Sequence, residues 1–577
     1  MYCRCTRLSR TRHNAVPWAL LLLATVALGA GLGLRDPSPP DEPRFVLAAK
    51  QMVESGQWLI PHRGSELYAH KPPVFMWLQA AAYQVVRDWE VAFLLPSLLA
   101  ALGTLWLTWD LGRRLWNPRI ASHGAFALLA TLQFGLQAKR GQIDMVLVFW
   151  TTLSLWGLAI HLLRGPERNA LLVGGFAAGI GTVTKGVGFL PLLMLLPWWV
   201  GRRIDRTTAA NDARNPAMHL WPWLPAAFLA GVGVWLLPML VTVLGSDDPA
   251  LRRYASEILF RQTGTRYVES WHHVRPGWYY LQVIATLWLP GALLLPWLVP
   301  AWWRRIRRGD RRTACLVGWS LLVLVFFSAS PGKREVYLFP ALPAMCIAAA
   351  PLLPALLRRT SVRYVLLGYV VVLGLALAGL GAGGLAGASW APRLAAERSL
   401  GPAVMQTLLA WLAVLGGGLV LLAAWARPRR AAMAVVGASV LVWMVYGLAL
   451  APGLDASSSA RKLMHDVRAR IGSDAELGLV AWREQHLLQA QEPVREFGFE
   501  RDFHAQWRDA LAWLAQKPGD RWLFALKDVA RDCVDPAQLI GLERSSRRDW
   551  VLVPATAVVP GCVPRAVGTT PKRMDEP

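Results

Sequence analysis

Long apolar runs are the feature that most constrains this chain. Thirteen of them approach the roughly 20 residues that a helix needs to cross a bilayer core about 30 Å thick, and clusters of charge separate them. Only 17% of the 577 residues are charged, whereas 54% are hydrophobic. A soluble chain of this length would divide into several domains with charged surfaces. We therefore predict a polytopic α-helical membrane protein with about thirteen transmembrane helices. The predicted spans lie near residues 15–34, 91–110, 120–137, 143–163, 170–183, 187–200, 220–244, 277–302, 313–329, 336–357, 363–389, 404–426 and 431–451.

The net charge of +24 reports membrane topology and does not indicate a nucleic-acid partner. Basic clusters directly follow apolar runs, and short loops rich in arginine are retained on the cytoplasmic side. One orientation, with a cytoplasmic N-terminus, places all of these clusters inside. The clusters are Arg113 and Arg114; Arg202, Arg203 and Arg206; Arg304, Arg305, Arg307 and Arg308; Arg358 and Arg359; and Arg427, Arg429 and Arg430.

The first apolar run, 15–34, also has features of a signal peptide. Arginines precede it, and Ala27-Leu28-Gly29 has the small-x-small form of a cleavage site. The run is longer than a signal sequence usually is, and many spans follow it. We interpret it as an uncleaved first span, and an odd number of spans then places the C-terminus outside.

This orientation predicts a transmembrane domain over residues 1–454 and a soluble domain outside over 455–577. The external loop 35–90 contains juxtamembrane helices. The first of these follows Asp41, and its apolar residues repeat at helical spacing, as expected of a helix on the membrane surface. A second external loop covers 245–276.

The composition becomes mixed and polar after residue 455, which indicates a small α/β domain. Residues 476–482 and 521–526 have the pattern of short strands, and 505–516 that of an intervening helix. If this domain is periplasmic, Cys533 and Cys562 can form a disulfide, because that compartment is oxidising.

Basic residues on the external side depart from the positive-inside pattern. A cationic rim at headgroup depth suits the phosphate of a lipid whose tail stays in hydrocarbon. The alternative for each residue alone is a side chain that anchors a helix end at the interface. The six rim residues are Lys71, Lys139, Arg140, Lys185, Lys333 and Arg334.

Two carboxylates are candidate site residues. Asp144 begins a span, where an ionisable group is costly unless it faces protein or water; the alternative is an ion pair with Lys139 or Arg140. Asp41 stands before Glu-Pro, which suits a helix N-cap, and a cap can coexist with a catalytic role.

External histidines suggest a metal only weakly. His70, His272 and His273 could join Glu66 or Glu257 in binding one, but no compact ligand spacing supports this. Histidines near tryptophans at a membrane interface are more often plain polar anchors.

Taken in order, several motifs resemble the bacterial lipid A aminoarabinose transferases and, more distantly, the protein O-mannosyltransferases, which share the C-type glycosyltransferase fold. The first 350 residues or so carry the resemblance. The motifs are Asp41-Glu42-Pro43-Arg44-Phe45 with the following 56–62, Lys71-Pro72-Pro73, Ile143-Asp144-Met145, Thr184-Lys185-Gly186, 273–280, and Gly332-Lys333-Arg334 continuing to Pro340.

The resemblance implies thirteen spans, a periplasmic domain and roles for individual residues. Asp41 would be the leading catalytic carboxylate and Asp144 the second. Binding of the carrier phosphate or the sugar would fall to Arg44, Lys71, Lys185, Lys333, Arg334 and Tyr337, and we add the external residues Arg140 and Arg266 to this set.

One departure from the family concerns His70, where relatives usually have a glutamate. Imidazole can bind zinc but cannot supply the same charge. A divalent metal, zinc or magnesium, with His70 and His273 among its ligands is therefore an open expectation, as is the identity of the donor sugar.

These observations predict an enzyme of the bacterial inner membrane. It would transfer a sugar, such as 4-amino-4-deoxy-L-arabinose, from polyprenyl phosphate to lipid A or another periplasmic acceptor by inverting displacement. The alternative is a flippase or exporter of lipid-linked sugars, although transporters tend to carry charges at the midplane and internal repeats, which this sequence lacks. A third possibility is a sensor whose C-terminal domain binds a ligand.

Overall fold

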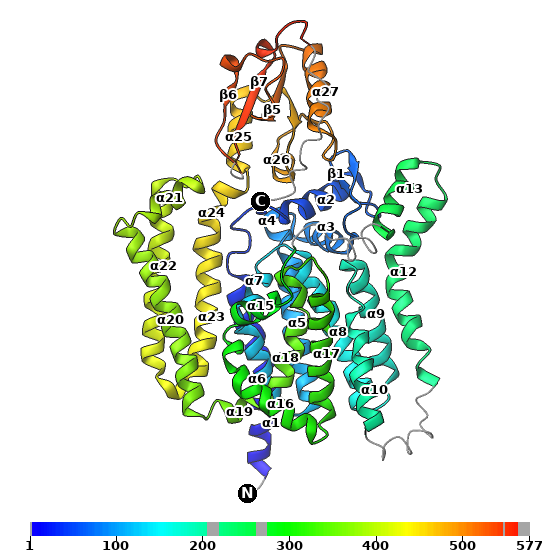
Figure 1. Cartoon of the computed structure of the whole chain (residues 1–577), viewed down its shortest axis with the longest axis vertical. Coiled ribbons are helices and arrows are strands. Elements are labelled where there is room, and N and C mark those ends of the chain that lie inside the picture. Colours follow the sequence, from blue (N-terminus) through cyan, green and yellow to red (C-terminus); the bar gives the residue numbers. More distant parts are fainter. Residues whose placement is uncertain (1–2, 205–218, 261–273, 546–547, 563–577) are drawn as a thin grey trace.

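A helical bundle carries a small α/β domain at one end (Figure 1). The computed structural model describes residues 3–204, 219–260, 274–545 and 548–562. The predictions for Arg206, Arg266, His272 and His273 fall outside these ranges.

The bundle contains helices that follow the predicted apolar runs and a few short ones that lie outside them. They are α1 (Cys3–Gly29), α5 (Leu95–Leu115), α6 (Pro118–Leu129), α7 (Leu132–Ala138), α8 (Ile143–Leu163), α9 (Arg168–Lys185), α10 (Leu195–Ile204), α12 (Trp223–Leu244), α13 (Pro249–Ser256), α15 (Tyr279–Leu287), α16 (Leu295–Arg307), α17 (Arg311–Ala329), α18 (Ala341–Ala349), α19 (Leu353–Leu356), α20 (Thr360–Leu385), α21 (Trp390–Glu397), α22 (Pro402–Ala426), α23 (Ala431–Val445) and α24 (Ala451–Ser458). Short 3₁₀ segments η1 (Leu190–Met194), η4 (Gly291–Leu294) and η5 (Glu335–Leu338) interrupt them.

Among the described residues, seven helices are long and apolar enough to cross a membrane, and one bent pair would make eight. The polytopic class is thus confirmed, while the count of thirteen stays a prediction. The difference arises because hydropathy does not detect breaks. The run 277–302 divides into 279–287 and 291–307, which meet at 103°, and the run 120–137 divides between α6 and α7.

The arginine-rich helix ends gather at one end of the bundle. The start of α1, the last turns of α10 and α16, and α19 all lie away from the α/β domain (Figure 1). If that end faces the cytoplasm, as positive loops favour, the α/β domain lies outside. This orientation remains a prediction.

The external loop forms two helices, α2 (Glu42–Ser55) and α3 (Val74–Val86), joined by the hairpin β1 (His62–Arg63) and β2 (Glu66–Leu67). The α2 helix ends at Ser55, and the residue that follows is Gly56, whose φ of 72° suits glycine. Its apolar face, however, does not lie on the membrane surface. Phe45 packs edge-on to Phe75 of α3, with ring centroids 5.3 Å apart, so the amphipathic pattern reports burial in protein.

The α/β domain holds a five-stranded sheet in the order β4-β3-β5-β7-β6. Both strands and the helix predicted here are present, as β3 (Glu476–Val480), β5 (Arg521–Leu526) and α27 (Phe503–Gln516). The prediction missed α25 (Arg461–Ile471), α26 (Glu484–Gln489), β4 (Val494–Glu496), β6 (Ile540–Gly541) and β7 (Trp550–Pro554). A disulfide joins the predicted pair, Cys533 and Cys562.

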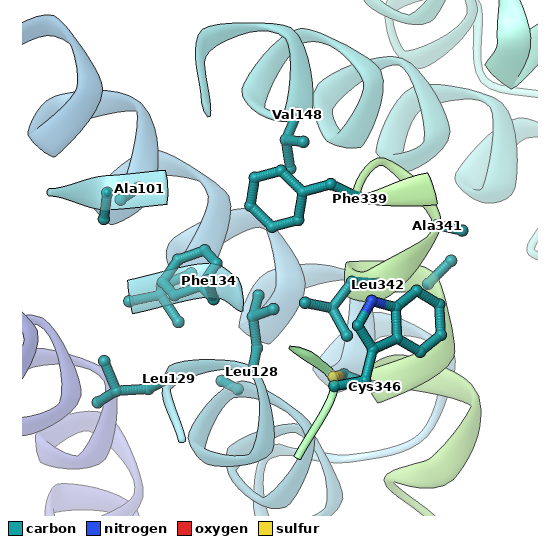
Figure 2. Packing of buried hydrophobic residues seen from close by; sticks show 14 of the residues in the cluster. Ala101, Leu128, Leu129, Phe134, Val148, Phe339, Ala341, Leu342 and Cys346 are labelled. Carbon is teal, nitrogen blue, oxygen red and sulfur yellow. The ribbon is translucent and has the colours of Figure 1, made fainter. Parts of the chain in front are cut away.

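One hydrophobic core anchors the segment that follows η5. Figure 2 shows Phe339 between Val148 of α8 and Phe134 of α7, and the rings of Phe134 and Phe339 lie 6.5 Å apart. Phe339 is fully buried, so dispersion and burial fix the chain directly after Tyr337. The core thereby holds in place a loop that carries several of the predicted site residues.

The α/β domain docks on the external loop through charged side chains. Arg63 is 3% exposed and its guanidinium lies 2.5 Å from Glu500 and 3.8 Å from the centroid of the Phe499 ring. His70 lies 3.3 Å from the same carboxylate. Glu66 accepts backbone N–H groups from Phe499 and Glu500. The hairpin and the domain therefore share one interface.

Glycines allow α20 and α22 to approach closely, as small residues commonly do in membranes. A Cβ on Gly416 would collide with the backbone of Ala378, whereas a Cβ on Gly417 would meet nothing within 4 Å. We predict that Gly416→Ala destabilises the protein by about 1–3 kcal/mol, the usual cost of overpacking. Gly417→Ala is the matched control. Thermal unfolding in detergent, followed by circular dichroism, measures both, and equal midpoints for the two variants would contradict the prediction.

Docking should weaken in acid because of Glu500. Its pKa falls to about 2 because His70 donates a hydrogen bond and Arg63 adds its charge, which together outweigh burial. A carboxylate with a lowered folded pKa stabilises the folded state above its ordinary value of 4.5, and this stabilisation is lost as pH falls towards 2. We expect the unfolding midpoint of the wild type to fall more steeply below pH 4.5 than that of Glu500→Gln.

The matched control for this titration is Glu543→Gln, because Glu543 forms an exposed ion pair with Lys462. That variant should keep the wild-type slope. A Glu500→Gln protein with the same acid slope as the wild type would show that Glu500 does not titrate with docking.

Candidate functional site

Asp41 lies at the end of the bundle that carries the α/β domain. It precedes α2, but its backbone is helical and its side chain makes no capping hydrogen bond. The prediction that Asp41 caps the helix is therefore wrong. The carboxylate instead lies 3.3 Å from the Arg334 guanidinium, and Gln142 Nε2 donates to it at 3.4 Å. Arg44 lies 3.8 Å away on the other oxygen.

A buried ion pair that the sequence analysis missed holds Asp41 in place. Arg35 binds the next residue, Glu42, through two hydrogen bonds of 2.6 and 2.8 Å. Glu42 also accepts the backbone N–H of Gly141 at 2.8 Å. This carboxylate thereby ties the start of α2 to the turn between α7 and α8, and the turn brings Gln142 beside Asp41. Glu42 was visible in the Asp-Glu-Pro-Arg motif, but nothing local indicated its partner.

The second carboxylate, Asp144, pairs with Lys185. Their side chains are 9% and 11% exposed, and the lysine amine donates directly to the carboxylate. The predicted alternative partners, Lys139 and Arg140, are therefore wrong. Lys139 instead donates to the carbonyl of Ala30. Because α8 begins one residue before Asp144 and α9 ends at Lys185, the packing of these two helices brings the pair together.

The loop before α18 contributes Arg334 and Tyr337 to the candidate site. Burial would lower the pKa of Arg334, yet the carboxylates of Asp41 and Asp144 outweigh it and raise that pKa above its ordinary value. Tyr337 lies beside the other cation, since Lys185 Nζ is 5.4 Å from the centroid of its ring. The motif around 332–340 thus reaches both carboxylates.

The remaining predicted cations have different surroundings. Lys333 is 5% exposed, and its amine donates to the carbonyls of Arg275 and Ser330 at 3.2 and 2.6 Å. Arg140 is half-buried and its side chain has no hydrogen bond or ion pair within the described part of the chain. Lys71 is half-buried before α3. Their roles in binding stay predictions.

Arg44 connects this cluster to the α/β domain. Its Nε donates to Glu484 of α26 at 2.9 Å. Burial opposes the charge of Arg44, but Glu484 outweighs it and the pKa of Arg44 rises above its ordinary value. Sequence analysis missed Glu484, because 440 positions separate it from Arg44 and no local pattern marks such a pair.

The described residues do not provide a convincing metal site. Nowhere within them do three or more His, Cys, Asp or Glu side chains come together as a ligand set. His70 contacts the carboxylate of Glu500, and the guanidinium of Arg63 binds the same carboxylate. The positive charge of Arg63 therefore occupies the position that a metal ion bound by His70 and Glu500 would take. His273 falls outside the described ranges. We therefore derive no chemical step through a metal.

The candidate site combines positive and negative side chains, one pair nearly buried and the other partly exposed. Asp41 pairs with Arg334, and Asp144 pairs with Lys185. Such a set can hold a phosphate on the cations, because charge-assisted hydrogen bonds strengthen away from water. It can also present a carboxylate to the group bonded to that phosphate. The geometry therefore suits the binding of an anionic group such as a phosphate.

The chain is similar in sequence to several known proteins. A family model described as dolichyl-phosphate-mannose-protein mannosyltransferase matches residues 70–235. Two curated proteins named undecaprenyl phosphate-alpha-4-amino-4-deoxy-L-arabinose arabinosyl transferase are each 30% identical to the chain. The protein from Pseudomonas fluorescens (strain Pf0-1) aligns over 52% of this chain and 51% of its own length. The protein from Pseudomonas aeruginosa (strain PAO1) aligns over 52% and 53%. The chain thus spans about half the length of these relatives.

Two solved structures share the fold over nearly the whole chain. The crystal structure of ArnT from Cupriavidus metallidurans bound to undecaprenyl phosphate is similar with a TM-score of 0.69 at 21% identity, and covers 95% of this chain and 99% of that one. The apo state of the same protein gives 0.66 at 22% identity, covering 96% and 100%. The resemblance inferred from the motifs is confirmed: the chain is similar in sequence to the aminoarabinose transferases and, over residues 70–235, to the protein mannosyltransferases, and it shares the fold of the solved structures.

Proposed function

We propose that this chain transfers a sugar from a polyprenyl-phosphate carrier to lipid A or another acceptor outside the inner membrane. The observation that carries the proposal is the pairing of two carboxylates with cations at one end of the bundle, Asp41 with Arg334 and Asp144 with Lys185. The relatives' names supply the donor, undecaprenyl-phosphate-linked 4-amino-4-deoxy-L-arabinose.

The reaction is an inverting displacement at the anomeric carbon of the donor. An acceptor oxygen forms a new bond to that carbon while the bond to the phosphate oxygen breaks. The electron pair leaves with the polyprenyl phosphate. Lys185 and Arg334 would stabilise the negative charge that develops there, which is where preorganised donors lower a barrier most.

The role of Asp41 depends on the acceptor. A hydroxyl acceptor must lose a proton, and Asp41 would accept it as a general base. A lipid A phosphate is already largely ionised at neutral pH, because its second pKa is about 6. Asp41 would then orient the acceptor or hold the amino group of the sugar.

The cluster lies near one end of the bundle, and this position supports an enzyme over a flippase. Transporters place their charged sites near the bilayer midplane at interrupted, repeated helices. Here Asp144 stands in the first turn of α8 and Lys185 is the last residue of α9. An enzyme and a flippase also differ in outcome, because only an enzyme makes a new covalent product.

Mass spectrometry of lipid A tests the proposed acceptor and sugar together. Cells that express the protein should contain lipid A species heavier by one aminoarabinose, and cells without it should lack them. Purified protein with the lipid-linked donor should form the same product in detergent. An unchanged lipid A profile would exclude this acceptor, and the absence of transfer to any supplied acceptor would exclude the enzyme.

Replacing Asp41 distinguishes the two acceptor classes. With a hydroxyl acceptor, Asp41→Asn should lower turnover by about 10²–10⁴-fold, the usual contribution of a general base. With a phosphate acceptor, residual transfer should remain. Product formation by the purified variant measures this, with Asp247→Asn as control because Asp247 is fully exposed and forms an ion pair with the exposed Arg252. Wild-type rates from Asp41→Asn would contradict both versions.

A further inference from the structure

The surface between the α/β domain and the external loop contains a carboxylate shared by two arginines. Glu484 begins α26 and is 3% exposed. Its Oε1 accepts a hydrogen bond from Arg44 Nε at 2.9 Å and lies 3.5 Å from Arg63. A carboxylate this deeply buried is stable only while its partners remain, because removing one partner of a buried pair leaves an uncompensated charge.

Arg44 extends from this carboxylate to the candidate site. Its Nε faces Glu484, and its NH1 lies 3.8 Å from Asp41 Oδ1. The guanidinium is planar and rigid, so a contact that fixes one nitrogen also sets the direction of the others. Glu484 therefore sets the direction in which the NH1 group of Arg44 points, which is towards Asp41. Glu484 itself has no contact with Asp41 among those found in the structure.

The backbone supports the same geometry. Arg44 and Asp41 lie three positions apart at the start of α2, so a movement of this helix would carry both. Arg35 and Glu42 fasten the helix from the bundle side, through Gly141. Glu484 fastens it from the α/β side. The start of α2 is thus held by two buried carboxylates, its own Glu42 towards the bundle and Glu484 towards the α/β domain.

From these contacts we infer that Glu484 is a positioning residue for the transfer reaction, and that the α/β domain completes the active site by directing Arg44 towards Asp41. The inference rests on the proposed function. It assigns the α/β domain a task in turnover rather than in ligand sensing. A misplacement of about 1 Å at a reacting group can cost 10²-fold in rate, which is the scale to expect when this contact is lost.

The competing explanation is that Glu484 merely docks the domain. A matched variant separates the two, because Glu496 also crosses the interface. It accepts the backbone N–H of Ser65 at 2.7 Å, and no contact joins it to Arg44 in the structure. If docking alone matters, Glu496→Gln and Glu484→Gln should affect transfer to the same degree.

The experiment measures kcat and KM for undecaprenyl-phosphate aminoarabinose with lipid A as acceptor, using the full-length purified protein. Glu484→Gln should lower kcat by about 10²-fold, while KM for the donor stays close to the wild-type value, because Lys185 is untouched. Glu484→Asp keeps the charge and should recover part of the loss. Glu496→Gln should stay near wild type, and thermal unfolding confirms that each variant is folded.

A double-mutant cycle tests whether Glu484 acts through Arg44. Arg44→Gln alone and the Arg44→Gln, Glu484→Gln double variant should have similar rates, because residues that act as one unit are not additive. Multiplicative losses would overturn the inference, as would a Glu484→Gln protein no slower than Glu496→Gln. A wild-type protein that transfers no sugar would instead overturn the proposed function, and this inference with it.

Discussion

The buried ion pair between Arg35 and Glu42 is the interaction on which the site depends. Two charges this far from water are stable only when their geometry is good and their remaining hydrogen-bonding capacity is filled. The Arg35 guanidinium also donates a hydrogen bond to the carbonyl of Lys139. The Glu42 carboxylate also accepts the backbone N–H groups of Ser38 and Gly141. Two segments distant in sequence, 35–42 and 139–141, are fixed together as a result.

The turn at Gly141 shows how tight this junction is. A Cβ at this position would collide with the ring of Phe93, so glycine allows the turn to approach α4 (Trp89–Ala92) and the residue that follows it. The N–H of Gly141 then reaches Glu42. Asp41, Gln142 and Asp144 are placed by this junction rather than by the propensities of their own helices.

Much of the architecture could be predicted from the sequence because a membrane imposes strong rules. Apolar length predicts spans, and the clustering of arginine predicts orientation. The breaks within helices could not be predicted in this way, because a run such as 277–302 is equally apolar on both sides of its bend.

The sequence indicated several residues of the candidate site but not their pairings. The ordered motifs point to Asp41, Asp144, Lys185 and Arg334. The structure pairs Asp41 with Arg334 and Asp144 with Lys185, and their joint role in transfer stays a prediction. The cap assigned to Asp41 failed because the local preference of aspartate competes with a stronger tertiary partner, the Arg334 guanidinium. Glu484 was missed for the opposite reason: its partners Arg44 and Arg63 lie 440 and 421 positions away, and no local pattern marks such contacts.

The pairing of Lys185 with Asp144 sets a condition on any phosphate that binds here. The carboxylate of Asp144 already balances the positive charge of the Lys185 amine. Breaking a nearly buried ion pair is costly unless another anion takes the place of the carboxylate. A carrier phosphate diester bears one negative charge, so it can take the place of the carboxylate beside Lys185 with little change in local charge. Asp144 would then need a new partner, and Arg334 is near enough for the two charges to interact. Donor binding in the proposed reaction is accordingly an exchange of partners within the cluster, which requires the cations to be held in place by the surrounding fold before the donor arrives.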